Sequence, residues 1–133
     1  MFDNMIASLR EKSPLIHCIT NYVTVSDVAN MLLACGASPI MADDAAEVQE
    51  ISGIASGLCL NLGTLHRSTV DSMLLAGRTA AERGIPIVLD PVGVGAAAQR
   101  AMAAQALLRE LPIAVLRGNV SEVKTIAGVA SST

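Results

Sequence analysis

Five short, mostly apolar runs recur along the chain, and longer segments with helical periodicity separate them. The runs cover residues 14–20, 38–41, 57–62, 85–90 and 112–117. Each run is apolar at nearly every position, which is typical of strands that are buried on both faces of a sheet. Strands that alternate with helices in this way form a parallel sheet. The sequence therefore predicts an α/β fold with a mostly parallel central sheet covered by helices on both faces.

The helical periodicity is clearest in residues 69–83, where Val70, Met73 and Leu74 fall on one face. Gly84 then ends the predicted helix. No charge run, low-complexity segment or Pro/Gly-rich linker divides the 133 residues. We therefore expect residues 1–133 to form a single α/β domain.

Residues 24–34 form another predicted helix, and its surface is apolar nearly all round. Only Ser26, Asp27 and Asn30 interrupt the apolar residues. Such a helix needs cover on more than one side, from another layer of the chain or from a second subunit. We favour a second subunit and hence an oligomer.

Composition excludes several classes of partner. The 9 basic and 12 acidic residues give a net charge of −3 and form no basic stripe, so we expect no binding to nucleic acid. The sequence shows neither a signal peptide nor a run of roughly 18 apolar residues, so we expect no membrane association. Cys18, Cys35 and Cys59 lack the spacing of a zinc site, and we interpret them as reduced thiols of a cytoplasmic protein.

The end of the fourth run carries the first candidate site. Asp90 comes directly after apolar residues, and Gly93 and Gly95 follow it. Ligands of parallel sheets bind outside the carboxyl ends of the strands. A glycine-rich turn at that edge lets backbone N–H groups approach an anion. The arrangement favours a phosphate group together with a cation.

A dinucleotide site is an alternative for this turn, because Gly93, Gly95 and Ala98 match the pattern G-x-G-x-x-G/A loosely. An Asp-Pro pair, however, separates the strand from the glycines. The acidic residue about twenty positions on, Glu110, falls in the last turn of a helix rather than at a strand end. An NAD-dependent oxidoreductase is therefore our third choice of function.

The fifth run continues into "VLRGNVSEV", where Asn119 begins a predicted helix and Glu122 follows three residues later. This spacing is nearly a capping box, which by itself needs no further function. Glu122 and Asp90 nevertheless follow consecutive strands, and Mg²⁺ prefers a few carboxylates together with water and phosphate oxygens. One glutamate can fill both roles. Arg117, at the same edge, is either a phosphate ligand or an ordinary loop arginine.

Two residues of the earlier runs leave alternatives open. His17 is either a hydrogen-bonded core residue, which we favour, or a group that reaches the carboxyl edge. Met41 ends its strand, where it either lines an apolar pocket or fills core space.

Four segments together resemble hydroxyethylthiazole kinases, thiamine-salvage enzymes of the ribokinase-like superfamily. They are "HCITNYVTVSDVANMLLACGASPIMA", "LNLGTLHRSTVDSMLLAG", "PIVLDPVGVGA" and "LRGNVSEV". The resemblance covers about residues 14–128 and implies a ribokinase-like layered fold. It also implies transfer of the γ-phosphoryl group of ATP to the hydroxyl of 4-methyl-5-(2-hydroxyethyl)thiazole, by homotrimers with active sites between subunits.

The resemblance assigns roles at the phosphate end of the site. Arg117 and Asn119 would bind ATP at its phosphates. Asn119 and Glu122 match the N-x-x-E motif that organises magnesium in this superfamily, and Asp90 would assist there. Magnesium is the implied cofactor and ATP the implied co-substrate.

At the substrate end, the resemblance implies that Met41 contacts the thiazole and that Asn21 with its loop shapes the pocket. The family's general base, glycine-rich anion hole and much of its adenine site would lie beyond Thr133. We therefore expect the chain to be truncated at its carboxyl end and inactive on its own. The alternative is a non-catalytic module, derived from a kinase fold, that binds a small molecule or nucleotide.

Overall fold

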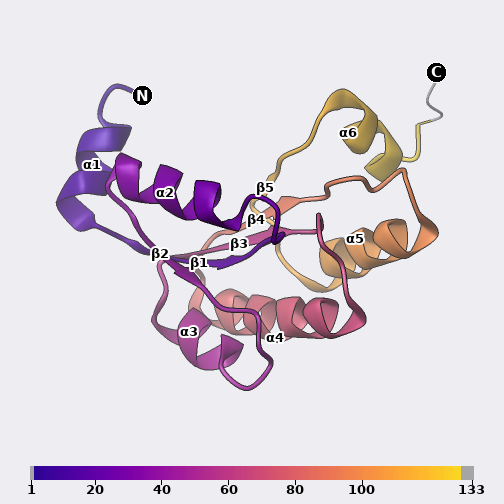
Figure 1. Ribbon diagram of the computed structural model, residues 1–133, viewed down its shortest axis with the longest axis horizontal. Coiled ribbons are helices and arrows are strands. Elements are labelled where there is room, and N and C mark those ends of the chain that lie inside the picture. Colours follow the sequence, from indigo (N-terminus) through magenta and orange to yellow (C-terminus); the bar gives the residue numbers. More distant parts are fainter. Residues whose placement is uncertain (1, 130–133) are drawn as a thin grey trace.

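A five-stranded sheet runs through the middle of the computed structural model, which describes residues 2–129 (Figure 1). The strands are β1 (Leu15–Ile19), β2 (Ser38–Met41), β3 (Gly57–Asn61), β4 (Ile87–Asp90) and β5 (Val115–Leu116). They lie in the order β2-β1-β3-β4-β5, and every neighbouring pair is parallel. This confirms the predicted α/β fold with a parallel central sheet.

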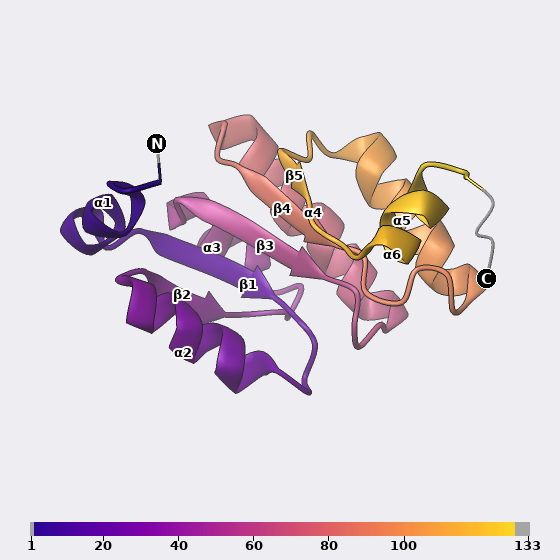
Figure 2. The ribbon, with the colours of Figure 1, turned by 90° about the horizontal axis from the view of Figure 1, so that it is seen from above.

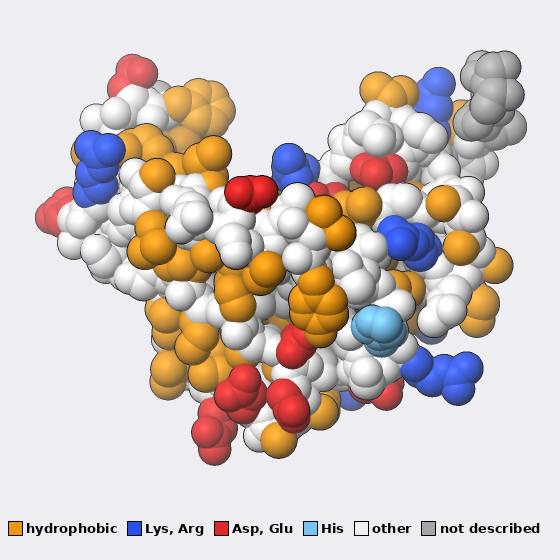
Figure 3. Space-filling view, in the orientation of Figure 1, with side chains coloured by type: hydrophobic (Ala, Val, Ile, Leu, Met, Phe, Trp, Pro, Cys, Tyr) orange, Lys and Arg blue, Asp and Glu red, His pale blue; other side chains and the backbone are white. Residues whose placement is uncertain are grey.

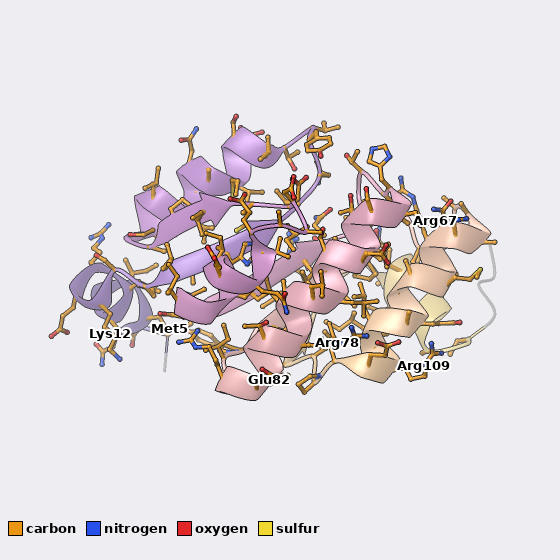
Figure 4. All side chains as sticks on the ribbon, turned by 90° about the horizontal axis from the view of Figure 1, so that it is seen from below. Met5, Lys12, Arg67, Arg78, Glu82 and Arg109 are labelled. Atoms are coloured by element: carbon orange, nitrogen blue, oxygen red, sulfur yellow. The ribbon has the colours of Figure 1, made fainter. Side chains whose placement is uncertain are left out.

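Helices lie on both faces of this sheet. One face carries α1 (Met5–Lys12) and α2 (Val25–Cys35), as Figures 1 and 2 show. The other carries α3 (Val48–Ile54), α4 (Arg67–Arg83) and α5 (Ala98–Glu110), which lie side by side in the view from below (Figure 4). The last helix, α6 (Val120–Ile126), follows β5 and packs against α5. None of the helices within residues 2–129 is long and apolar enough to cross a membrane.

Two strands begin at least two residues later than the sequence predicts. β4 begins at Ile87 rather than at residue 85, because the N–H of Ile85 still donates to Ala80 of α4 at 3.1 Å. Gly84, with φ of 68°, makes this left-handed end of α4. β5 keeps only Val115 and Leu116 of the predicted residues 112–117. Within the described residues it pairs only with β4, and Pro112, at the start of the predicted run, lacks the N–H that a ladder needs.

The core lies between the sheet and the helices α4 and α5. Its sheet side consists of fully buried aliphatic side chains, among them Leu60, Ile87 and Leu89. The facing helices present small residues, and a Cβ added to Gly77 of α4 would overlap the Leu111 side chain. Small residues at this contact let α4 approach its neighbours closely.

The opposite face is covered less completely. α2 packs over β2, whereas Ile16, Cys59 and Val88 line an apolar hollow of about 500 Å³ beside it. Figure 3 shows the surface hollowed between α2 and α6. Within the described residues no side chain of α2 is buried, and Met31 and Leu33 are 66% and 58% exposed. Cover of α2 by a second subunit therefore stays a prediction.

Candidate functional site

All five strands end at one edge of the sheet, where the arrows in Figure 2 point. The candidate residues are carried by the loops that follow these ends. Asn61 and Asp90 are the last residues of β3 and β4 and lie opposite one another in the register. Leu89 pairs with Leu116, so the next residues, Asp90 and Arg117, also come side by side.

Asp90 and Arg117 form an ion pair at this edge, with 2.6 Å between Arg117 Nη1 and Asp90 Oδ2. The Asp90 side chain is only 12% exposed, whereas that of Arg117 is 76% exposed. Burial raises the pKa of Asp90, the Arg117 charge lowers it, and the Glu122 charge raises it again. The net shift is upward. The guanidinium is thus exposed at the surface, while the carboxylate is largely buried beneath it.

Glu122 joins two segments through its carboxylate. The predicted capping box is present, because Asn119 Oδ1 accepts from the Glu122 N–H and Glu122 Oε2 accepts from the Asn119 N–H, both at 2.9 Å. Glu122 Oε1 accepts from the N–H of Gly93, at 3.2 Å. The last bond ties the loop after β4 to the start of α6. The capping role of Glu122 is therefore confirmed, and its metal role stays a prediction.

One cavity of about 340 Å³ brings together the residues expected to bind phosphate and metal. Its lining consists of Asp90, Val92, Arg117, Gly118, Asn119 and Glu122. Two carboxylates and one guanidinium therefore face the same space. Among residues 2–129, no group of three or more His, Cys, Asp or Glu side chains is placed to hold a metal. A magnesium ion here would need water and phosphate oxygens to complete its shell, which is how Mg²⁺ is commonly bound.

Met41 lines a second, smaller cavity of about 110 Å³. Its other walls are Cys18, Thr20, Tyr22, Val25, Ala42 and Asp43. The Tyr22 hydroxyl donates to Asp43 Oδ2 at 2.7 Å, which ties the loop after β1 to the loop after β2. The cavity therefore combines apolar walls with the polar pair of Tyr22 and Asp43.

Asn21 does not line either cavity. Its Oδ1 accepts from the N–H and the hydroxyl of Thr24, at 2.9 and 3.0 Å, and its Nδ2 donates to Asn61 Oδ1 at 3.1 Å. These bonds hold the loop that carries Tyr22. The side-chain oxygen of Asn21 is thus occupied within its own loop, and its role at a substrate pocket stays a prediction.

His17 is a core residue, as we favoured. It is fully buried, and its Nε2 donates to the Ala42 carbonyl at 2.8 Å, because a carbonyl can only accept. The Ser52 hydroxyl then donates to His17 Nδ1, also at 2.8 Å. Burial lowers the pKa of His17 and so favours the neutral ring. Its contact anchors Ala42, which lines the Met41 cavity.

A sequence model of the Hydroxyethylthiazole kinase family matches residues 6–133. The chain belongs to this family. A hydroxyethylthiazole kinase of Clostridium tetani is 56% identical over 130 residues, which are 98% of this chain and 47% of the relative. One from Ruminiclostridium cellulolyticum is 54% identical over 129 residues, 97% of this chain and 47% of the relative.

A solved hydroxyethylthiazole kinase from Pyrococcus horikoshii OT3 has the same fold. Its TM-score is 0.91 at 41% sequence identity, and the match covers 94% of this chain and 49% of that one. The chain therefore spans about half the length of the hydroxyethylthiazole kinases it matches. The resemblance seen in the four sequence segments is confirmed.

The sequence analysis did not predict the contacts of three residues. Tyr22 and Asp43 meet across two loops, and Arg100 of α5 donates to the carbonyls of Gly63 and Val92. Each contact joins residues that are 8 to 37 positions apart. No motif or periodicity signals such pairs, because they depend on which loops the sheet places side by side.

Proposed function

We propose that this chain provides the thiazole pocket and part of the phosphate and magnesium site of a hydroxyethylthiazole kinase. Such an enzyme phosphorylates the hydroxyl of 4-methyl-5-(2-hydroxyethyl)thiazole with ATP in thiamine biosynthesis and salvage. The observation that carries the proposal is the 340 Å³ cavity at the carboxyl edge of the sheet, which Asp90, Arg117, Asn119 and Glu122 line together.

The side chains of this cavity suit phosphoryl transfer. The transition state is loose and spreads negative charge over the phosphoryl oxygens, so catalysis depends on positioning and charge neutralisation. The exposed guanidinium of Arg117 is a planar donor that matches phosphate oxygens. Asn119 lines the cavity and holds Glu122 through the capping box. Magnesium, when bound by Asp90 and Glu122, would neutralise further phosphate charge.

The Met41 cavity suits the thiazole ring. Met41, Val25 and Cys18 offer polarisable and apolar contacts, and the Tyr22–Asp43 pair sits at the rim. Isothermal titration with the thiazole alcohol should show about tenfold weaker binding by Met41→Ala. Met102→Ala, which truncates a 68% exposed methionine on α5, is the matched control and should bind like the wild type. Equal affinity of both variants would remove Met41 from the pocket.

For residues 1–133 by themselves we propose binding without turnover. Asp90 is held by Arg117, and Glu122 accepts from two backbone N–H groups. Within residues 2–129, the two carboxylates that line the phosphate cavity thus both have protein partners, and neither is free to take the proton of the thiazole hydroxyl. Saturable binding of the thiazole without ADP release is the expected result. Thiazole-dependent ADP release by a preparation of verified mass, 13.7 kDa, would contradict it.

We also propose that the working enzyme is a cytoplasmic homotrimer. Val23 in the loop after β1 is 87% exposed, next to Tyr22 at 59%. Met31 and Leu33 extend this apolar surface along α2. A partner subunit on this surface would lie beside the Met41 cavity. The free thiols of Cys18, Cys35 and Cys59 suit a reducing compartment, and light scattering after gel filtration tests the trimer.

A further inference from the structure

Arg100 of α5 links the loops that follow two neighbouring strands. Its Nη1 donates to the carbonyl of Val92, after β4, at 2.8 Å, and its Nη2 donates to the carbonyl of Gly63, after β3, at 2.9 Å. The guanidinium is a rigid, permanently charged fork, so these two bonds fix the positions of the two carbonyls relative to one another. A lysine at this position would offer a single ammonium instead.

The first of these bonds acts on Glu122 through one peptide group. The carbonyl of the Val92–Gly93 peptide accepts from Arg100, and the N–H of the same peptide donates to Glu122 Oε1 at 3.2 Å. A cation and a carboxylate thus hold opposite ends of one peptide plane. Hydrogen bonds to charged groups are stronger than neutral ones, and bonds in series polarise each other. Arg100 therefore helps to orient the peptide group that holds Glu122 Oε1.

Gly93 leaves space for the Arg100 guanidinium beside the loop after β4. Its φ of 66° lies in the left-handed region, and a Cβ there would come within 2.8 Å of Arg100 Nη1. Any side chain at residue 93 would push the guanidinium off its carbonyl acceptors. The glycine is thus needed both for backbone conformation and for the space that Arg100 occupies.

The second bond reaches toward the thiazole pocket. The N–H of Gly63 donates to Asn61 Oδ1 at 2.8 Å, and the same oxygen accepts from Asn21 Nδ2 at 3.1 Å. The hydroxyl of Thr64 accepts from the Tyr22 N–H at 3.1 Å. Arg100 is therefore the point at which hydrogen bonds from the phosphate cavity and from the Tyr22 loop meet.

We propose that Arg100 is a positioning residue of the kinase site. It holds Glu122 at the phosphate cavity through the Val92–Gly93 peptide and sets the spacing between this cavity and the Met41 pocket through Gly63. Arg100 does not line either cavity, so it acts through the loops and not on the ligands. The inference rests on the proposed function, because the position of Glu122 matters only if the cavity binds magnesium and phosphate.

The test compares Arg100→Met and Arg100→Lys in an enzyme of the relatives' full length that contains this sequence. Loss of a residue that orients metal ligands typically costs about 10- to 100-fold in metal affinity or activity. We expect kcat to fall and the half-saturating Mg²⁺ concentration to rise, both by about 10-fold or more, while KM for the thiazole stays within about twofold. Arg100→Lys should fall between Arg100→Met and the wild type.

Arg78→Met is the matched control. It removes an arginine whose Nη2 lies 2.6 Å from Glu110 on the exposed side of α4 and α5, away from both cavities. This control should keep the wild-type kcat and Mg²⁺ response. Melting curves of all variants show whether a loss of activity comes from unfolding. Arg100→Lys keeps the positive charge, so it separates the loss of the fork from the loss of the charge.

A second measurement does not depend on turnover. The ¹H–¹⁵N shift of the Gly93 amide in residues 1–133 reports the bond to Glu122, so Arg100→Met and Glu122→Gln should both move it and Arg78→Met should not. An unmoved Gly93 resonance in Arg100→Met, or a wild-type kcat and Mg²⁺ response in that variant, would overturn the positioning role. Absence of thiazole-dependent turnover in the wild-type enzyme would instead overturn the proposed function itself.

Discussion

Arg117 Nη1 lies 2.6 Å from Asp90 Oδ2, and the two side chains differ sharply in exposure, at 76% and 12%. The parallel register places them together, because Leu89 pairs with Leu116 one residue earlier. An ion pair with one buried and one exposed partner gives little stability, yet it keeps a cation beside the proposed phosphate position. The pair is therefore better explained by ligand binding than by folding.

Arg117→Ala should separate the contribution of the ion pair to ligand binding from its contribution to stability. We expect kcat/KM for ATP to fall by about 100-fold or more in the complete enzyme, because a charged donor to the phosphates is lost. The free energy of unfolding should fall by about 1 kcal/mol or less, because the guanidinium is mostly exposed. Steady-state kinetics and urea denaturation measure both, with Arg109→Ala, an exposed arginine of α5, as the control. A large stability loss with unchanged kinetics would reverse the assignment.

The raised pKa of Asp90 predicts a pH-dependent stability. Burial raises the pKa above its ordinary value of 3.8, so the folded state disfavours the ionised carboxylate. Relative to Asp90→Asn, the wild type should therefore lose stability as the pH rises from below 3.8 through the folded-state pKa. Urea unfolding of both proteins at a series of pH values measures the difference. A difference that does not change with pH, or that changes in the opposite sense, argues against a raised pKa.

The lowered pKa of His17 predicts that stability depends on pH in the opposite sense. Burial lowers its pKa from the ordinary 6.5, so its stabilising contribution is complete above that pH and is lost as the pH falls through the folded-state value. His17→Gln, which cannot titrate, should lose less stability over this range than the wild type. His17→Ala should lower the free energy of unfolding by about 3 kcal/mol, because it leaves a buried carbonyl and a buried hydroxyl unpaired. The account would fail if His17→Gln kept the full acid sensitivity.

Gly93 and Gly84 offer a matched pair of substitutions. Their φ values are 66° and 68°, but a Cβ meets Arg100 at Gly93 and nothing within 4 Å at Gly84. Gly84→Ala should cost about 1 kcal/mol for the backbone alone. Gly93→Ala should cost about 1 kcal/mol more, because Arg100 loses its carbonyl acceptors. The excess should vanish in an Arg100→Met background, and its persistence there would mean that Arg100 is not its cause.

The strands could be predicted from the sequence because each reads as a nearly unbroken apolar run, although in the described residues the sheet face beside α2 is only partly covered. The capping box of Asn119 and Glu122 could be predicted because it is local, with both partners within four residues. The length of β5 could not, because an edge strand is limited by its one partner, β4.

Arg100 shows why the rest of the site could not be predicted. Its two acceptors belong to loops after β3 and β4, and only the order of strands in the folded sheet brings them to one guanidinium. Tyr22 and Asp43 are a second case, since their loops meet only because β1 and β2 are neighbours. Local sequence patterns predict residues at a strand end, whereas contacts between loops depend on the fold.

The most direct test of the account is thiazole-dependent ADP formation by an enzyme of the relatives' full length that contains this sequence, compared with its Glu122→Gln variant. The account predicts turnover that requires Mg²⁺ and the thiazole alcohol, and a fall of about 100-fold in the variant together with a higher Mg²⁺ requirement. Folding of the variant is checked by its melting curve. Wild-type turnover in a folded Glu122→Gln variant would contradict the phosphate and magnesium site described above.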